Sequence, residues 1–413
     1  MMSVSFAFRR ILLGSAAMLA CGVVAGVGAG GANAEDLRPA VGKPLAAAKA
    51  ELARHNYAKA QADVNEADAV GGKSSYEDFI ITEMRGAIAQ QAGDTKTAAN
   101  AYEKLIASGK LSSAQQAQMT LAIASMAYSA HDYDRAITWL DRYTKLAGPN
   151  PQTTRLKIQA YYEKKDYANA AKLQQAQIDQ TVKAGGKPAE EQLQLLSACQ
   201  RAMNDTAGFT HTLELLVTYY PKPDYWQNLV HGIQTDPSFP AHLSFELQRL
   251  QLALGLLGDE AAYMDATESA VQDGALGEGK SIMAAGTSAG VMGKADAARE
   301  QRLAALIDKR IAAKTASLPK DEAAAANEKD GSDLVDDGIT EASLGNSDKG
   351  IALIQQGIAK GGLRFPDQAK LDLGYAQMKA GKKADAVATF KSVTPGTPES
   401  RLSRLWVLYL KTH

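Results

Sequence analysis

One stretch of the sequence, residues 274–290 (GALGEGKSIMAAGTSAG), contains two patterns that carry chemistry in other proteins. Residues 274–281 match G-x-x-x-x-G-K-[ST], a loop in which backbone amides and a lysine, here Lys280, hold nucleotide phosphates. Residues 286–290 match G-x-S-x-G, in which a sharp turn after a strand exposes a nucleophilic serine, here Ser288. The stretch therefore raises two enzymatic hypotheses, nucleotide binding and serine hydrolysis.

The residues around this stretch favour neither hypothesis. Both motifs require a buried strand immediately upstream, but the preceding segment YMDATESAVQD (263–273) has a helical period and one polar face. A serine nucleophile also needs a general base, and the only histidine downstream is His413. We therefore expect a helix that contains Ser288, and enzymatic chemistry ranks last among the functional hypotheses.

No metal or cofactor site is predicted. The six histidines are scattered, and none forms the His-x-x-x-His pair that binds zinc on a helix. The acidic segment KDGSDLVDD (329–337) lacks the alternating oxygen ligands and glycine of a calcium loop. We interpret this segment as part of a solvated linker.

The N-terminal segment 1–34 has the features of a secretory signal peptide. Arg9 and Arg10 precede an apolar, small-residue run over 11–28, and the pattern Ala-Asn-Ala ends at Ala34. Cleavage is predicted after Ala34, which implies export and a periplasmic location. Because no equally apolar segment follows, the mature chain is expected to have no transmembrane segment.

Three other interpretations of this segment remain open. The apolar run could act as a membrane anchor, and the two arginines resemble a twin-arginine export signal without its usual flanking residues. The tetrapeptide MLAC, ending at Cys21, resembles a lipoprotein cleavage box, which would give the protein a lipid anchor. If cleavage follows Ala34 instead, Cys199 is the one remaining cysteine and no internal disulfide can form.

Charge and composition limit the partners and the fold. The signal segment holds two of the 45 basic residues and no acidic one, so the mature chain has 43 basic against 46 acidic residues, a net charge of −3. This balance does not attract nucleic acid, so no nucleic-acid partner is expected. The chain is long for a single core. Abundant alanine and few aromatic residues favour helices, either in several domains or in a repeat array.

Polar turn residues recur along the chain, mostly 34 to 39 residues apart. Most have alanine or another small residue four positions later and a small residue eight positions earlier, as one helix face on each side of a turn would. The turn residues are Asn56, Asp94, Asp132, Asp166, Asp205, Asp259, Lys294, Asn346 and Lys382. The small residues before them are Ala48, Gly86, Ala124, Ser197, Gly286, Gly338 and Gly374.

This pattern resembles the tetratricopeptide repeat, a helix–turn–helix unit of about 34 residues. Residues 126–140 (MAYSAHDYDRAITWL) and 373–393 (LGYAQMKAGKKADAVATFKSV) match it best. The resemblance implies an all-α fold, a right-handed α-solenoid of about nine helical hairpins. The alternative is an ordinary bundle of alanine-rich helices. In the register of the repeat, Cys199 occupies a small-residue position, where burial is expected.

Two long intervals between turns predict inserts in the solenoid. The first, 221–244, is rich in proline and aromatic residues, and Tyr225 and Trp226 in it either pack onto the solenoid or form an exposed patch for a partner. The second, 314–332, is charged and alanine-rich and is either a linker or an extended helix end. We place a boundary there. This divides the chain into a solenoid over 35–313, a linker, and further repeats over 333–413 that end in a capping helix over 398–413.

The resemblance also implies a binding surface, because solenoids bind with the concave face that their first helices line. The family's usual contact positions, carried onto this chain by register, are Gln90, Ser125, Tyr128, Arg155, Gln159, Tyr162 and Arg201. Tyr128 and Tyr162 are 34 residues apart and would stack in adjacent repeats. The alternative is that these are ordinary polar residues on a solvated face.

The sequence therefore predicts a non-enzymatic scaffold of the cell envelope that binds a protein or peptide in its concave groove. The second hypothesis is a binding module for a small or extended ligand such as a glycan or lipid. The sequence does not identify the partner.

Overall fold

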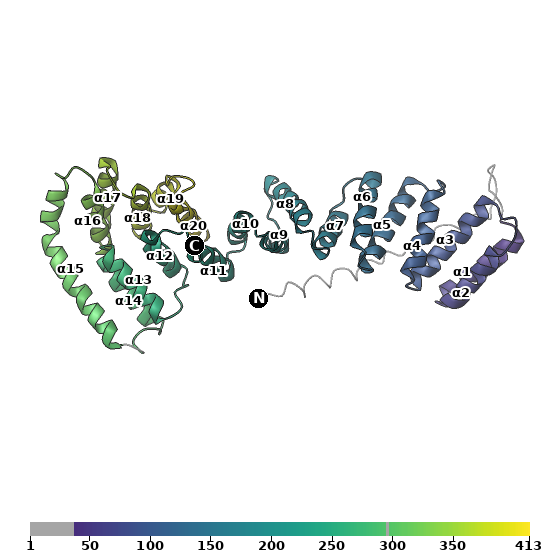
Figure 1. Ribbon diagram of the computed structural model, residues 1–413, viewed down its shortest axis with the longest axis horizontal. Coiled ribbons are helices and arrows are strands. Elements are labelled where there is room, and N and C mark those ends of the chain that lie inside the picture. The colour runs from purple at the N-terminus through teal and green to yellow at the C-terminus, as the bar shows by residue number, and fades with distance from the viewer. Residues whose placement is uncertain (1–36, 295–296) are drawn as a thin grey trace. The chain divides into compact units, whose positions relative to one another are not determined.

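The computed structural model describes residues 37–294 and 297–413, which form twenty α-helices, one short 3₁₀-helix and no strand. The proposed signal peptide and Cys21 lie outside these residues. Most of the helices pair into antiparallel hairpins with short turns, as the repeat pattern predicts (Figure 1).

The chain divides into two compact units between Thr153 and Thr154. The first contains three hairpins: α1 (Pro39–Ala53) with α2 (Tyr57–Asp68), α3 (Ser75–Gln91) with α4 (Thr95–Ala107), and α5 (Ser113–Ser129) with α6 (Tyr133–Ala147). The boundary falls within α7 (Pro151–Glu163), most of which belongs to the second unit.

The second unit contains the other hairpins and two single helices. After α7 come α8 (Tyr167–Lys183), α9 (Glu190–Ala202), α10 (Thr206–Tyr219), the single helix α11 (Pro223–Gln234) and the 3₁₀-helix η2 (Ala241–Leu243). Then follow α12 (Ser244–Ala253), α13 (Glu260–Gln272), α14 (Leu276–Ser288), α15 (Ala297–Ala325), α16 (Ser332–Ser343) and α17 (Ser347–Lys360). The chain ends with α18 (Pro366–Lys379), α19 (Lys383–Lys391) and α20 (Pro398–Thr412).

Seven of the turns inside the hairpins share one geometry. The residue before the turn residue has a left-handed φ of 57° to 97° at His55, Gly93, His131, Lys165, Asn204, Gly345 and Gly381. The turn residue then donates its amide proton to the carbonyl five residues earlier, as Asp94 does to Ala89 at 2.8 Å, which closes the first helix. Where the turn residue is aspartate, its carboxylate also caps the second helix, as Asp132 does by accepting from the Arg135 amide at 3.1 Å. One short sequence therefore both ends and starts a helix.

Small residues allow the two helices of a hairpin to approach closely, as the sequence predicts. A Cβ atom added at Gly374 would lie 2.6 Å from the Phe390 ring, and one added at Gly86 would lie 2.8 Å from the Tyr102 ring. Both distances are shorter than van der Waals contact allows. The large side chain of each second helix thus fills the space that glycine leaves on the first.

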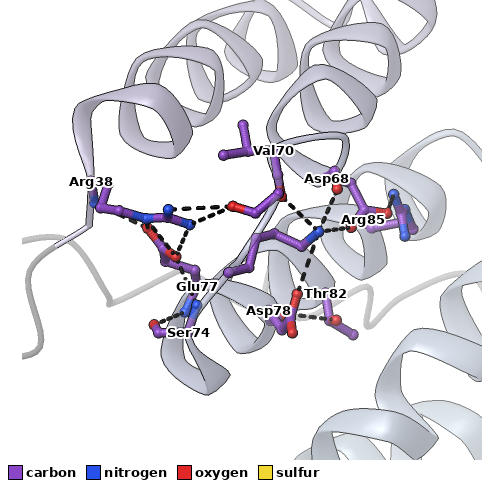
Figure 2. A network of polar contacts seen from close by, with 10 residues as sticks. Arg38, Asp68, Val70, Ser74, Glu77, Asp78, Thr82 and Arg85 are labelled. Carbon is purple, nitrogen blue, oxygen red and sulfur yellow. Dashed lines mark hydrogen bonds and ion pairs between the residues drawn. The ribbon is translucent and has the colours of Figure 1, made fainter.

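In the first unit, a polar network joins the start of α1 to the start of α3 (Figure 2). The guanidinium of Arg38 binds the carboxylate of Glu77 at 2.8 Å and also donates to the carbonyl of Gly71 at 3.3 Å. Glu77 is 1% exposed, and it accepts the Ser74 amide at 2.8 Å while its own amide donates to the Ser74 hydroxyl. This reciprocal capping fixes where α3 begins.

The second unit returns on itself, which the sequence did not predict. Helix α20 packs against α10, α12, α18 and α19 (Figure 1), and one continuous core includes residues of α7–α12 and of α18–α20. Arg401 of α20 binds Asp236, after α11, at 2.6 Å. Leu402, Leu405 and Trp406 of α20 are buried. This helix therefore does more than cap the last repeat, because it ties that repeat to helices far back along the chain.

Both predicted inserts prove to be largely helical. Residues 314–325 continue α15, which corrects the assignment of 314–332 to a linker and matches the alternative of an extended helix end. The acidic segment 329–337 is not a solvated linker either, because α16 begins at Ser332 and Asp337 is buried and paired with Lys314 at 2.9 Å. High alanine content favours helix over linker in residues 314–325.

Candidate functional site

The predicted groove residues lie on first helices, as expected, but they belong to two different units. Gln90 lies on α3, and Ser125 and Tyr128 lie on α5 of the first unit. Arg155, Gln159 and Tyr162 lie on α7, and Arg201 lies on α9 of the second unit. Gln90, Arg155 and Arg201 are exposed and the other four are half-buried. Whether they bind a partner stays a prediction.

Several of these side chains already contact their own hairpin. The rings of Tyr128 and Tyr133 pack edge to face with centroids 5.6 Å apart, and those of Tyr162 and Tyr167 do the same at 5.6 Å. The guanidinium of Arg201 lies over the Phe209 ring at 5.1 Å. These contacts hold each side chain against the second helix of its hairpin. A partner would therefore meet a preorganised surface in each unit.

The predicted aromatic patch at Tyr225 and Trp226 is not exposed. Tyr225 is 9% exposed and Trp226 is 2% exposed. The Tyr225 hydroxyl donates to Glu190, and it accepts from the Gln194 amide at 2.7 Å. The proline-rich insert thus packs its aromatic residues onto the solenoid, because α11 occupies the place of a first helix and buries one face.

A cavity of about 260 Å³ lies where the first helices of four successive hairpins meet, in the second unit. These are α12, α14, α16 and α18, and the return of α18 to α12 closes the cavity on one side. Its apolar wall includes Leu252, Ile282, Ile339 and Ala376. Ser281 and Lys379 also line it and are exposed, so they mark its opening.

One wall of this cavity contains a buried arginine held by three carboxylates. Arg249 of α12 is 3% exposed, and it binds Glu278 of α14 at 2.9 Å and Asp372 of α18 at 2.6 Å. It also binds Glu246, one helical turn away, and its guanidinium lies over the rings of Phe245 and Tyr375, at 4.2 and 4.5 Å from their centroids. We call Arg249, Glu246, Glu278 and Asp372 the α12 charge cluster.

The α12 charge cluster has more acidic than basic groups. Burial raises the pKa of Glu246 well above its ordinary value, even though Arg249 opposes the shift. The Glu246 Oε2 atom is buried and has no hydrogen-bond partner among the described residues. Burial alone would lower the pKa of Arg249, but the surrounding carboxylates hold it above its ordinary value. Three carboxyl groups therefore surround a single guanidinium.

A second cavity, of about 530 Å³, shares Asp372 and Ile339 with the first. Asp273 and Asp336 line it near Asp372. Partial desolvation, reinforced by neighbouring carboxylates, raises the pKa of each of these two to about 6, although both reach solvent. Lys314 and Arg364 also line it, so its charges are mixed.

The glycine-rich stretch 274–290 contributes to the first cavity as packing, not as an enzyme motif. It forms α14, preceded by the helix α13 rather than by a strand. Lys280 is exposed and pairs with Asp308 of α15 at 2.7 Å, and Ser288 is the last residue of the helix. A Cβ atom at Gly277 would lie 2.0 Å from the Ser343 carbonyl, so this glycine lets α14 approach the end of α16.

Other reactive groups are explained by burial. Cys199 is fully buried, as predicted, and burial raises the pKa of its thiol to about 11, which keeps it unreactive at neutral pH. Over residues 37–294 and 297–413, no three His, Cys, Asp or Glu side chains form a group that could hold a metal ion. None of the helices in those ranges combines the length and the apolar content needed to cross a bilayer.

Sequence reasoning missed the α12 charge cluster, although a signal was present. Glu246 and Arg249 are three residues apart among apolar residues in FELQRL (245–250), and Asp372 lies between two leucines in KLDLGY (370–375). Charged residues at buried positions of first helices must be paired. The pairing itself spans 123 residues, from Arg249 to Asp372, so the pattern indicates the charged positions but not their partner.

Comparison with known proteins identifies the repeat. A family model described as a tetratricopeptide repeat matches residues 83–152 and 336–400, one segment in each unit. A search among curated proteins returned no match.

Among solved structures, the TPR2AB-domain:pHSP90 complex of yeast Sti1 is 14% identical, covers 73% of this chain and all of its own, and has a TM-score of 0.24. Yeast Tom70 is 10% identical, covers 89% of this chain and 94% of its own, and has a TM-score of 0.21. The two matched segments coincide with hairpins described above, so these parts of the chain are identified as tetratricopeptide repeats.

Proposed function

We propose that this protein is an exported, non-enzymatic scaffold of the cell envelope that binds a segment of a partner protein on the inner faces of its first helices. The repeat fold supports protein binding. Export to the periplasm rests on the sequence of residues 1–34 alone.

The observation that carries the proposal is the cavity between α12, α14, α16 and α18. Four first helices converge there and surround about 260 Å³ of space with an apolar wall and paired charges. An apolar concavity with a few placed polar groups is the usual form of a binding site. The half-buried tyrosines Tyr128 and Tyr162, one in each unit, offer additional contact surface.

Site-specific photo-crosslinking in the native envelope tests this proposal. A crosslinking residue would replace Ser281 at the cavity opening, with Ser288 on the same helix as its control. A second pair would compare Tyr162 with Lys172, which is exposed on the second helix of that hairpin. We expect a discrete protein adduct from Ser281, from Tyr162 or from both, and none from the controls. Equal capture at test and control positions would refute the proposal.

The second candidate, a module that binds a small or extended ligand, is favoured by the partly enclosed form of the cavity. Native mass spectrometry of the purified protein tests it, because a retained glycan or lipid would add a discrete mass. Adducts of such molecules at Ser281 in the crosslinking experiment would lead to the same conclusion.

A further inference from the structure

The cavity between α12, α14, α16 and α18 has a chemical polarity that specifies what can enter it. Its lining contains Glu278 and Asp372 of the α12 charge cluster, and one turn further along the same helices it is apolar, at Leu252, Ile282 and Ala376. A ligand that matches both parts of the lining has a positive group at one end and an aliphatic part next to it. An anionic group is disfavoured, because the guanidinium of Arg249 already donates to three carboxylates.

The size of the cavity limits the size of the ligand that can enter it. About 260 Å³ lies below the usual range of sites for whole small-molecule ligands. One long side chain fits such a space better than a drug-sized molecule does. Lysine has an unbranched aliphatic stem and a terminal ammonium group with three donors, which suits both parts of the lining.

The acceptors for an ammonium group are already fixed in place. Glu278 binds Arg249 through both of its oxygen atoms, at 3.1 and 3.2 Å to Nε and 2.9 Å to a terminal nitrogen, which orients its carboxylate. Asp372 is held at 2.6 Å from Arg249. Both carboxylates line the cavity, and a carboxylate accepts up to about four hydrogen bonds. Asp372 therefore keeps more free acceptor capacity than Glu278, which already accepts from two nitrogens of Arg249 and from the Tyr375 hydroxyl.

We propose that this cavity receives the side chain of a lysine from the bound partner segment, with the ammonium group on Glu278 and Asp372 and the stem against Leu252, Ile282 and Ile339. This inference rests on the proposed function, because it assigns a chemistry to the partner that the scaffold binds. Lys379 lies at the opening, where its positive charge opposes the entry of a cationic ligand.

The test uses calorimetric titration of the full mature chain with a short peptide, blocked at both ends, that has lysine at its centre. The same peptide with norleucine at the centre keeps the stem and removes the ammonium group. We expect the lysine peptide to bind about tenfold or more tightly than the norleucine peptide, as for other desolvated charge contacts. Equal affinities would overturn the assignment of an ammonium site.

Variants of the cavity sharpen the test. Glu278→Gln should weaken binding of the lysine peptide about tenfold or more, and Lys379→Gln should strengthen it. A purely structural role of Glu278 does not explain the second effect, since Lys379 is exposed. Because Glu278→Gln also disturbs a buried pair, Ser281→Trp provides a variant that blocks the opening without changing the charges. Ser288→Trp on the same helix is its control and should bind as the parent chain does.

The remaining outcomes separate this inference from the proposed function. Capture of a protein at Ser281 together with no preference for the lysine peptide would keep the scaffold and reject the lysine site. Binding of n-pentylamine as tight as that of the peptide would reject a partner side chain and indicate a free alkylamine as the ligand. Lysine-dependent binding with no protein capture at any position would support the cavity chemistry and reject the scaffold.

Discussion

Each unit of this protein contains an arginine bound to carboxylates, and the two networks differ in balance. In the first unit, Arg38 is 46% exposed and serves one carboxylate, Glu77, which also accepts two backbone amides. In the second unit, Arg249 is buried, serves three carboxylates, and leaves Glu246 Oε2 without a partner among the described residues.

The two networks shift the pKa of their buried glutamate in opposite directions. Hydrogen bonds from Arg38 and Ser74 lower the pKa of Glu77 to about 2. Burial raises the pKa of Glu246 well above its ordinary value. The first network is satisfied and fastens one helix to another. The second places three carboxyl groups around one guanidinium next to a cavity, and one carboxyl oxygen there, Glu246 Oε2, has no partner among the described residues.

The largest difference in stability between the two networks should appear when the arginine of each is replaced. Arg249→Leu leaves the buried Glu278 and Asp372 without their counterion, so we expect a loss of about 3–5 kcal/mol of stability in the second unit. Hydrogen exchange of α12 and α18 measures this locally. The matched change Arg38→Leu should cost far less, since Arg38 is half-exposed. Similar losses for both would contradict the contrast between the networks.

Within the α12 charge cluster, two glutamates should respond unequally to the same substitution. Glu278→Gln removes the charge of a carboxylate that accepts from two nitrogens of Arg249. We expect this change to lower the free energy of unfolding by about 1.5–3 kcal/mol. Glu246→Gln should stay within about 1 kcal/mol of the parent, because burial already favours the uncharged form there. Chemical denaturation followed by hydrogen exchange gives both values. A larger loss for Glu246→Gln would reverse our interpretation of its pKa.

In the first unit, loss of the cap should have a moderate effect. Ser74→Ala removes the hydroxyl that accepts the Glu77 amide at 3.1 Å, and such caps contribute about 1 kcal/mol. Protection of the first turn of α3 from hydrogen exchange should fall, while that of α5 should not. Ser113→Ala, at the exposed first position of α5 and outside the capping interaction of Ser112, is the control. Equal effects of the two changes would show that the network in Figure 2 does not fix the start of α3.

The smallest predicted effect is the dependence on pH, which should have opposite signs in the two units. Glu77 has a lowered pKa of about 2 against 4.5 ordinarily, so its contribution is present above pH 4.5 and is lost as the pH falls toward 2. Asp273 and Asp336 have raised pKa values of about 6 against 3.8, so their contribution is complete below pH 3.8 and is lost as the pH rises through 6.

Local hydrogen exchange between pH 3 and 7 separates these two trends. Since Asp273 and Asp336 reach solvent, we expect each to contribute less than about 1 kcal/mol. Replacing both aspartates with asparagine should remove the pH dependence of exchange protection near α13 and α16. The pH dependence of α3 should stay unchanged. If protection changed with pH in the same direction in both units, a general effect of net charge would dominate over these individual groups.

The hairpins could be predicted from the sequence because each is specified locally. Asp94, Asp132 and Asp166 mark turns whose geometry depends on fewer than ten neighbouring residues, and Gly86 and Gly374 mark the close approaches. The helical extension of 314–325 was harder to predict, since Pro319 lies inside α15 and suggests a break.

The candidate cavity could not be predicted, because it depends on closure of the chain over a long distance. The return of α18 to α12 results from small rotations added over several hairpins, and no single repeat encodes it. The burial of Trp226 has a similar origin, since its neighbours in the core include helices near the C-terminus. Local pattern thus determines the elements, and accumulated geometry determines the site.

The closing contact of α20 with α10 and α12 also constrains how this protein can evolve. In the first unit, each hairpin packs mainly on its neighbours, so a duplicated hairpin would lengthen the stack and leave its contacts intact. Between α12 and α18, an added hairpin would move Asp372 away from Arg249 and Arg401 away from Asp236. The number of hairpins can thus change in the first unit without loss of these contacts. In the second unit, the ion pairs of Arg249 and Arg401 form only with the present number.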